Sequence, residues 1–227
     1  MPNAQYIKSM FDDISSRYDL LNDLLSAGTH RLWKKKLINS ALKSETRSVL
    51  DCATGTGDIA FGFEERSIQQ ITAIDFSPLM IKAANERKLK KGSRIDFQVQ
   101  DVSNLPFKEE EFDVATISFG IRNVENLERS LQELSRVSKN LFILEFGTPE
   151  NNLWKKIYFS SLKAYFPVFS LLTKRSDAYD YLISSSEKFP SGEKFCLLLK
   201  KHTSFTEFKY HPLFGGIAYI YEAKRLK

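Results

Sequence analysis

The residues best suited to chemistry surround a short glycine loop that follows an apolar run. Asp51 lies near the end of the run "SVLDCA" (48–53), and Gly55 and Gly57 come soon after it. Glycine after a strand lets the backbone turn sharply and lets a ligand approach the main chain. The spacing matches half of the dinucleotide-binding pattern G-x-G-x-x-G, with Ala60 at the third position. A lone Gly-x-Gly also occurs in ordinary turns, so the loop alone identifies no ligand.

Three acids that follow successive apolar runs narrow the class of ligand. Asp51 precedes the glycine loop, Asp75 stands 18 residues after Gly57, and Asp101 follows a third run. An acid at the position of Asp75 accepts hydrogen bonds from a ribose diol, and Asp101 is placed to reach an adenine edge. Asp51 would repel a pyrophosphate but suits a cation. The three acids therefore predict S-adenosylmethionine rather than NAD, although each acid alone also fits a cap or a surface charge.

Short apolar runs alternate with helical patterns, and this alternation must position the acids. The predicted strands lie at 48–53, 70–75, 95–100, 112–118 and 141–146. They are nearly continuous in apolar character, as strands covered on both faces should be. Ser77 and Pro78 form a typical start for one intervening helix. The alternation predicts right-handed crossovers and a parallel sheet covered by helices.

The two ends of the chain depart from this alternation. Residues 1–45 and 151–195 are helical in character, and the second segment is rich in aromatic residues. We predict that together they form a helical cap. Two late runs, 204–211 and 216–225, are predicted strands joined by a turn. We therefore expect an α/β fold in one domain over residues 1–227, with a doubly wound sheet, a helical cap and a closing antiparallel pair.

The composition limits the partners. The 227 residues carry a net charge of +5, a mildly basic balance that favours anionic partners without choosing among them. The basic cluster consists of Arg31, Lys34, Lys35 and Lys36. This cluster is either a solvated helix face or a surface that contacts anionic lipid headgroups. Binding of RNA would need a broader basic face, so no nucleic-acid partner is expected.

The same composition bears on location and metal content. No apolar run approaches the roughly 18–20 residues of a membrane-spanning helix, and the first residues lack the features of a secretion signal. Cys52 and Cys196 lie in apolar runs without metal-ligand spacing, so no metal site is expected. We predict a cytoplasmic protein and leave contact with a membrane surface open.

Longer motifs give the chain a family resemblance over almost its whole length. The most telling is "SFGIRNV" (118–124), beside "YDLLND" (18–23). Further matching stretches are "VLDCATGTGDIA" (49–60), "LEFGTPE" (144–150) and "FGGIAYIY" (214–221). The chain closely resembles the ubiquinone/menaquinone biosynthesis C-methyltransferases, which depend on S-adenosylmethionine and have a seven-stranded Rossmann-like fold. The resemblance implies a mostly parallel sheet with one antiparallel strand and a helical cap.

The resemblance also implies a set of cofactor-binding residues. The predicted set is Asp51, Gly55, Thr56, Gly57, Asp75, Asp101, Val102 and Ser118. Thr56 belongs to the glycine loop, and Ser118 ends the fourth predicted strand, where open α/β sheets bind ligands. Ser118 could instead cap its own loop. The chain departs from the family at Thr54, where glycine is common.

The implied reaction is methyl transfer to a ring carbon of a polyprenylated quinol. Arg122 stays protonated and is a poor base, so it would stabilise a quinolate oxygen or orient a water; alternatively it pairs with an acid to hold its loop. Asn123 could fix a quinol oxygen. Tyr18 could close over the substrate or pack in the cap. His30 could act as a base near neutral pH or be structural.

Several readings stay open at this stage. Demethylmenaquinol is the favoured substrate, and 2-methoxy-6-polyprenyl-1,4-benzoquinol is the alternative within the family. A methyltransferase for another small molecule or RNA, and a non-enzymatic nucleoside-binding module, are rivals. The aromatic residues of segment 153–190 would line an apolar route for the prenyl tail, or simply form a helix core. The oligomeric state is not determined, and a homodimer is one alternative.

Overall fold

The centre of the molecule is a seven-stranded sheet in the order β3-β2-β1-β4-β5-β7-β6. The computed structural model describes residue 26 and residues 28–43, 45–173 and 176–225. The strands are β1 (Ser48–Cys52), β2 (Gln70–Asp75), β3 (Asp96–Val99), β4 (Val114–Ser118), β5 (Asn140–Phe146), β6 (Glu207–Leu213) and β7 (Ala218–Lys224). Only β7 runs antiparallel to its neighbours. The predicted sheet, mostly parallel with one antiparallel strand, is confirmed.

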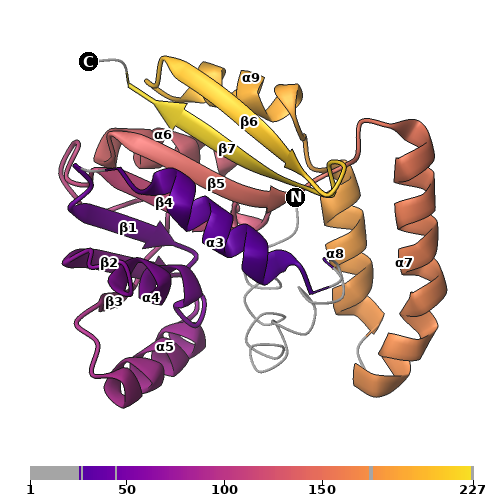
Figure 1. The fold of residues 1–227 in the computed structure, drawn as a ribbon, viewed down its shortest axis with the longest axis horizontal. Helices are drawn as coiled ribbons and strands as arrows, with labels where there is room; N and C mark the ends of the chain where they lie inside the picture. Colours follow the sequence, from indigo (N-terminus) through magenta and orange to yellow (C-terminus); the bar gives the residue numbers. More distant parts are fainter. Residues whose placement is uncertain (1–25, 27, 44, 174–175, 226–227) are drawn as a thin grey trace.

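Helices cover both faces of this sheet. They are α3 (His30–Ala41), α4 (Asp58–Glu64), α5 (Pro78–Lys91), the short 3-10 helix η2 (Ile121–Asn123), α6 (Leu127–Val137), α7 (Asn152–Thr173), α8 (Ser176–Lys188) and α9 (Glu193–His202). Helices α3, α4 and α5 lie over one face, and α6 and α9 lie over the other (Figure 1). Each face has its own core, with Phe63 and Phe97 in the first and Leu131 and Leu134 in the second. Burial on both faces explains why the central strands β1, β4 and β5 are mostly apolar.

The sequence signal for the start of α5 is confirmed. Ser77 precedes the helix, and its Oγ accepts a hydrogen bond from the backbone N–H of Met80 at 3.2 Å. Pro78 is the first helical residue, where its missing N–H leaves no helical bond unmade. This cap directs the chain away from the end of β2.

The strand order creates a ligand crevice at the carboxyl ends of β1 and β4. Strand β1 pairs with β2 on one side and with β4 on the other, so the connections leave it in opposite directions. Open α/β sheets bind ligands outside the carboxyl ends at such a switch point. The parallel register sets Asp51 beside Ala73 of β2 and Thr116 of β4. Asp51 and Asp75 therefore share one edge of the sheet.

Helices α7 and α8 lie side by side beyond this edge (Figure 1). They fall within the predicted cap segment 151–195. The other predicted segment, 1–45, is described only at residue 26 and from residue 28 onward, apart from residue 44. There α3 packs on the sheet and buries Trp33 and Leu37 in the first core. The division into one domain with a two-segment cap stays a prediction.

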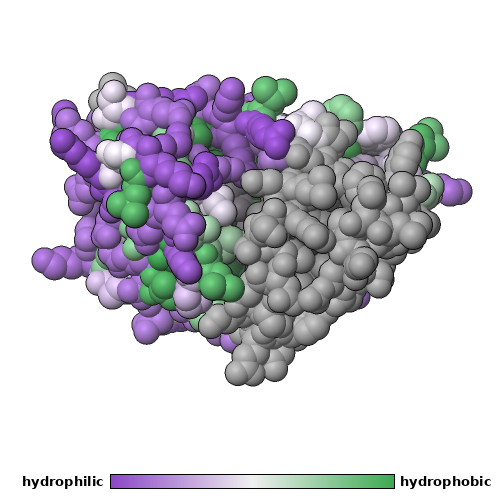
Figure 2. Space-filling model, turned by 90° about the horizontal axis from the view of Figure 1, so that it is seen from below, coloured by the Kyte–Doolittle hydropathy of each residue, from purple (hydrophilic) through white to green (hydrophobic). Residues whose placement is uncertain are grey.

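The surface of the described residues is mixed. Figure 2 shows a face on which these residues are largely hydrophilic, with hydrophobic side chains gathered in small groups. Among the helices that the structure describes, none is long and apolar enough to cross a membrane.

Candidate active site

The glycine loop turns the chain from β1 into α4. Gly55 and Gly57 have φ angles of 57° and 92°, in the left-handed region that favours glycine. A Cβ atom on Gly57 would also lie 2.8 Å from the ring of Phe97. Both the φ angle and this close contact therefore favour glycine at position 57. The backbone N–H of Gly55 donates to Asp75 Oδ2 at 2.8 Å. The loop is thus tied to the end of β2.

Asp51 lies beneath this loop and is almost completely buried. Its Oδ2 accepts a hydrogen bond from Thr54 Oγ1 at 2.6 Å, and its Oδ1 accepts one from Thr116 Oγ1 at 2.8 Å. Burial raises the pKa of Asp51 to about 7, although both hydroxyls and nearby Lys34 favour the ionised form. Both protonation states are therefore populated near neutral pH. A bound cation would favour the carboxylate.

Asp75 is held at the edge of the loop by two backbone amides. Its Oδ1 accepts a hydrogen bond from Ser77 N at 2.9 Å, and its Oδ2 accepts the bond from Gly55. The side chain is half-buried. Two amide donors fix the direction of the carboxylate, which suits a group that must meet a ribose diol.

Asp101 and Val102 lie after β3, which is separated from β4 by β2 and β1. Asp101 is exposed, and its Oδ1 accepts a hydrogen bond from Ser103 N at 2.8 Å, which forms a local turn. Val102 is buried in the second core. Neither residue lines the pocket around the glycine loop. Their predicted place at the adenine stays a prediction.

A pocket that is open to solvent lies at the carboxyl ends of β1 and β4. Of the predicted cofactor residues, it brings together Asp51, Gly55, Thr56 and Ser118. The Oγ atom of Ser118 is buried and has no hydrogen-bond partner within the described part of the chain. Buried hydroxyls are normally satisfied, so a polar ligand atom would complete this site. The acids and hydroxyls of the pocket fit a cationic nucleoside such as S-adenosylmethionine.

Two cations that sequence reasoning did not place meet at one acid of the pocket. Asp58 Oδ2 lies 2.9 Å from Lys34 Nζ, and Asp58 Oδ1 lies 2.8 Å from Arg87 Nη1. Arg87 Nη1 also donates to the carbonyl oxygen and Oγ1 of Thr56, both at 2.8 Å. Burial alone would raise the pKa of Asp58, but the two cations lower it to about 2. The trio joins α3 and α5 to the glycine loop.

Lys34 also divides the predicted basic cluster. Its side chain is only 14% exposed and points to the pocket, whereas Arg31, Lys35 and Lys36 are exposed. Position 34 follows Trp33, which is buried, so the helix turns this face toward the sheet. The spacing of charges along the sequence does not indicate that Lys34 faces the pocket while the other three residues face solvent.

Arg122 lies on η2, directly after β4, in a buried ion pair with Glu145 of β5. The exposed fractions of the two side chains are 1% and 0%. Glu145 Oε2 also accepts a hydrogen bond from Arg122 N at 3.2 Å, and Glu145 Oε1 accepts one from Phe146 N at 2.9 Å. Burial raises the pKa of Glu145, against the effect of Arg122 and these amides. The pair anchors the η2 loop to the end of β5, and a role for Arg122 in the reaction stays a prediction.

Asn123 is linked to the helices beyond the sheet. Tyr181 of α8 donates a hydrogen bond from its hydroxyl to Asn123 Oδ1 at 2.9 Å. The Nδ2 atom of Asn123 lies 3.5 Å from the carbonyl oxygen of Phe119, a long contact. The bond from Tyr181 sets which end of the Asn123 amide is the acceptor. The loop after β4 and helix α8 are therefore held together.

Of the two remaining predicted catalytic residues, His30 lies within the described part of the chain. His30 is buried at the start of α3, with its Nδ1 3.3 Å from Ser26 Oγ. It does not line the pocket. Tyr18 lies outside the described residues. Catalytic roles for both stay predictions.

Comparison with known proteins adds the identity of the family to this geometry. A model of the ubiE/COQ5 methyltransferase family matches residues 1–225. The chain belongs to this family. A ubiquinone/menaquinone biosynthesis C-methyltransferase UbiE from Bdellovibrio bacteriovorus is 37% identical over 226 residues, covering 97% of this chain and 96% of the relative. Its namesake from Brucella anthropi is 36% identical over 230 residues, covering 97% and 87%.

Solved structures share the fold of this ubiE/COQ5 methyltransferase. An S-adenosylmethionine-dependent methyltransferase from Thermotoga maritima has a TM-score of 0.66 at 18% identity, covering 97% of this chain and all of its own. The [4+2]-cyclase SpnF has a TM-score of 0.64 at 15% identity, covering 100% and 97%. Because a cyclase has this fold, architecture alone does not select methyl transfer. The family match carries that conclusion, and with it S-adenosylmethionine as the methyl donor.

Proposed function

We propose that this ubiE/COQ5 methyltransferase methylates a ring carbon of a polyprenylated quinol, converting demethylmenaquinol to menaquinol. The alternative within the family is the 2-methoxy-6-polyprenyl-1,4-benzoquinol of ubiquinone synthesis. The observation that carries the proposal is the family match over residues 1–225, in a chain whose polar pocket lies at the carboxyl ends of β1 and β4. The names of the relatives include both quinones, so the choice of a naphthoquinol is our hypothesis.

The residues of the pocket would bind and orient the methyl donor. When bound, S-adenosylmethionine supplies an electrophilic methyl group, which a ring carbon takes up as the carbon–sulfur bond breaks and the ring hydrogen leaves as a proton. Asp75 does not line the pocket but is tied to the glycine loop by two backbone amides, and its carboxylate would accept hydrogen bonds from the ribose. Asp51 meets the cationic end, and the unpaired hydroxyl of Ser118 gains a partner. The contribution of these groups is positioning, because the sulfonium is already a good leaving group.

The η2 loop would hold the quinol. Arg122 is paired with Glu145 and keeps the loop against β5. We propose that Asn123, whose amide is oriented by Tyr181, binds a quinol oxygen. Because Glu145 balances the charge of Arg122, we assign Arg122 the positioning of this loop, and stabilisation of a quinolate oxygen by its guanidinium is a further hypothesis. Tyr18 would close over the ring, and His30 is the candidate proton acceptor, although its burial beside Ser26 supports its structural alternative.

A prenylated substrate suggests where the protein works. We propose a cytoplasmic enzyme whose exposed basic residues Arg31, Lys35 and Lys36 contact anionic lipid headgroups. The tail would lie along segment 151–195, whose described residues Tyr158, Phe159 and Leu162 on α7 are buried in the first core. A homodimer is a further hypothesis that gel filtration with light scattering would test.

The test is a methyl-transfer assay with S-adenosylmethionine labelled in the methyl group. The purified protein is incubated separately with reduced demethylmenaquinol, with the benzoquinol alternative and with bulk RNA. A labelled C-methyl product from the naphthoquinol supports the proposal. If only the benzoquinol is methylated, the enzyme belongs to ubiquinone synthesis instead. If the label enters RNA, the substrate is a nucleic acid and not a quinol. Binding of the donor without any product would leave a nucleoside-binding module and overturn the proposal.

A further inference from the structure

We infer that Lys34 of α3 is a cofactor-binding residue that holds the carboxylate at the amino-acid end of S-adenosylmethionine. This inference rests on the proposed function, since it requires that cofactor in the pocket. Lys34 is one of the residues that line the pocket, and its side chain is 14% exposed. It comes from a helix outside the glycine loop, 24 positions before its partner Asp58.

Charge is the first reason. The amino-acid end of the cofactor carries both an ammonium and a carboxylate, so its site must offer both signs of charge. The other charged residues lining the pocket are the acids Asp51 and Asp58, which suit the ammonium. Lys34 is the one cation among the described residues that line the pocket. A carboxylate placed between these acids without Lys34 would be buried against like charges.

The sharing of Asp58 is the second reason. Asp58 faces two cations, Lys34 at 2.9 Å and Arg87 at 2.8 Å. One carboxylate between two cations leaves one positive charge over, so Asp58 alone does not neutralise Lys34; the other acid of the pocket near Lys34 is Asp51, which suits the ammonium of the cofactor. The ammonium of lysine has three N–H donors, and the bond to Asp58 uses one of them. Lys34 is therefore both oriented and able to bind an anion.

The position of α3 is the third reason. Trp33 and Leu37 flank Lys34 on the helix and are buried in the core, with exposed fractions of 7% and 0%. Because this face of α3 is buried, the Cα and Cβ atoms of Lys34 are held beside the pocket. The neighbouring Lys35 is exposed on the same helix and provides a matched control.

The experiment is isothermal titration calorimetry of the full chain with two ligands. One ligand is S-adenosylmethionine, and the other is decarboxylated S-adenosylmethionine, which lacks only the carboxylate. We expect Lys34→Met to weaken S-adenosylmethionine binding by about 10- to 100-fold, as for the loss of a hydrogen bond between charged groups. Its effect on the decarboxylated ligand should stay below about threefold. Lys34→Arg should recover much of the loss, and Lys35→Met should leave both affinities unchanged.

The two ligands separate direct contact from an effect through the loop. Equal loss for both ligands would show that Lys34 acts only by holding Asp58, and an unchanged affinity for S-adenosylmethionine would show no contact; either result overturns the inference. Retained binding of the decarboxylated ligand by Lys34→Met also shows that the variant is folded. If the wild-type chain binds neither ligand, the proposed function itself fails, which is a distinct outcome.

Discussion

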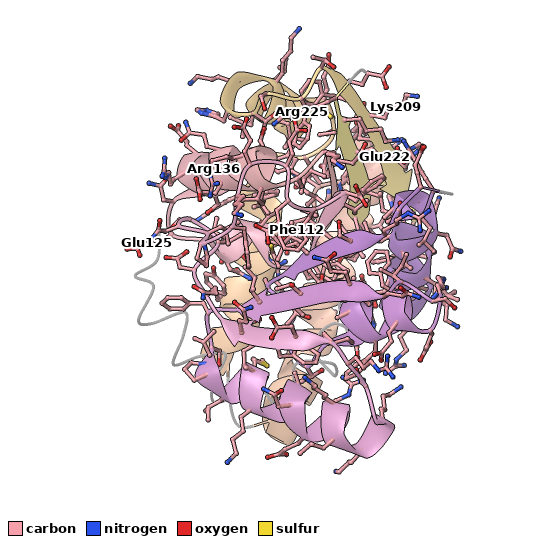
Figure 3. The ribbon with its side chains drawn as sticks, turned by 90° about the vertical axis from the view of Figure 1, so that its left-hand side faces the viewer. Phe112, Glu125, Arg136, Lys209, Glu222 and Arg225 are labelled. Atoms are coloured by element: carbon pink, nitrogen blue, oxygen red, sulfur yellow. The ribbon has the colours of Figure 1, made fainter. Side chains whose placement is uncertain are left out.

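At the amino edge of the sheet, acidic side chains pair with half-exposed cations, whereas at the carboxyl edge two acids are fully buried. Figure 3 shows the amino edge, with Arg136 and Arg225 on it. There Asp113 pairs with Lys139 at 2.8 Å, and Glu133 pairs with Arg136 at 2.7 Å. The hydrogen bond from Arg136 lowers the pKa of Glu133. For Asp113, burial would raise the pKa, but bonds from Lys139 and two backbone amides lower it.

Two buried acids at the carboxyl edge have pKa values shifted in the opposite direction, whereas the pKa of Asp58, which faces two cations there, is lowered. Burial raises the pKa of Asp51 to about 7 and also raises the pKa of Glu145, despite their hydrogen-bond donors. Acids at the amino edge therefore favour the folded state when ionised, while the buried acids at the carboxyl edge oppose folding when ionised. Perturbed acids of this kind cluster at functional sites, where a ligand can supply the missing charge. The contrast is what we expect if the amino edge serves stability and the carboxyl edge, as we propose, binds the cofactor.

The largest effect should come from breaking the buried pair at the carboxyl edge. Glu145→Ala removes the carboxylate that faces a buried guanidinium, and should lower the free energy of unfolding by about 3–5 kcal/mol. Urea denaturation measures this change. The double replacement Arg122→Met with Glu145→Leu should lose much less, because no charge is left buried. A loss below about 1 kcal/mol for the single variant would show that the pair is not anchored as described.

The next effect concerns the pH dependence caused by Asp51. Its folded-state pKa is about 7 and its ordinary value is 3.8, so the folded protein keeps this proton when the unfolded chain has lost it. The stability contributed by the neutral acid is then lost as the pH rises from about 4 to about 7. Asp51→Asn stays neutral, so its stability relative to wild type should increase by about 2–4 kcal/mol over this interval. A difference that does not vary with pH would refute the raised pKa.

A smaller effect is expected for Asp75, the acid at the carboxyl edge that we propose binds the ribose. Asp75→Ala should weaken binding of S-adenosylmethionine by about 1–3 kcal/mol, because it leaves ligand hydroxyls without their acceptor. Calorimetry measures the affinity. Asp96→Ala on β3 removes an exposed acid instead and serves as the control. Equal affinities for Asp75→Ala and wild type would exclude the ribose assignment.

The smallest effect should occur at the amino edge. Lys139→Met removes a half-exposed partner of Asp113 and should lower the free energy of unfolding by at most about 1 kcal/mol. Cofactor affinity should not change, since this edge lies at the opposite ends of the strands. Denaturation and calorimetry on one preparation test both points. A destabilisation as large as that of Glu145→Ala would erase the contrast between the two edges.

Part of the site was open to prediction because its signals are local. Gly55, Gly57 and Asp51 adjoin one strand, and Asp75 ends the next, so strand patterns alone bring them to one edge. Thr54 stands where the family often has glycine, and the sequence gives no sign that it has a partner. The structure shows that its hydroxyl bonds Asp51. The direction of a side chain in a loop depends on backbone angles that residue types do not specify.

Neighbouring residues carry the apolar periodicity, the glycine turns and the motifs, so the seven strands, their mostly parallel order and the family could be predicted from the sequence. The packing of the folded chain was needed to show that Lys34 turns into the pocket, that Arg87 shares Asp58 with it, and that Glu145 pairs with Arg122. These contacts join residues 23 to 29 positions apart. Their geometry is set by the packing of whole helices against the sheet, and so is the burial that shifts the pKa of each acid.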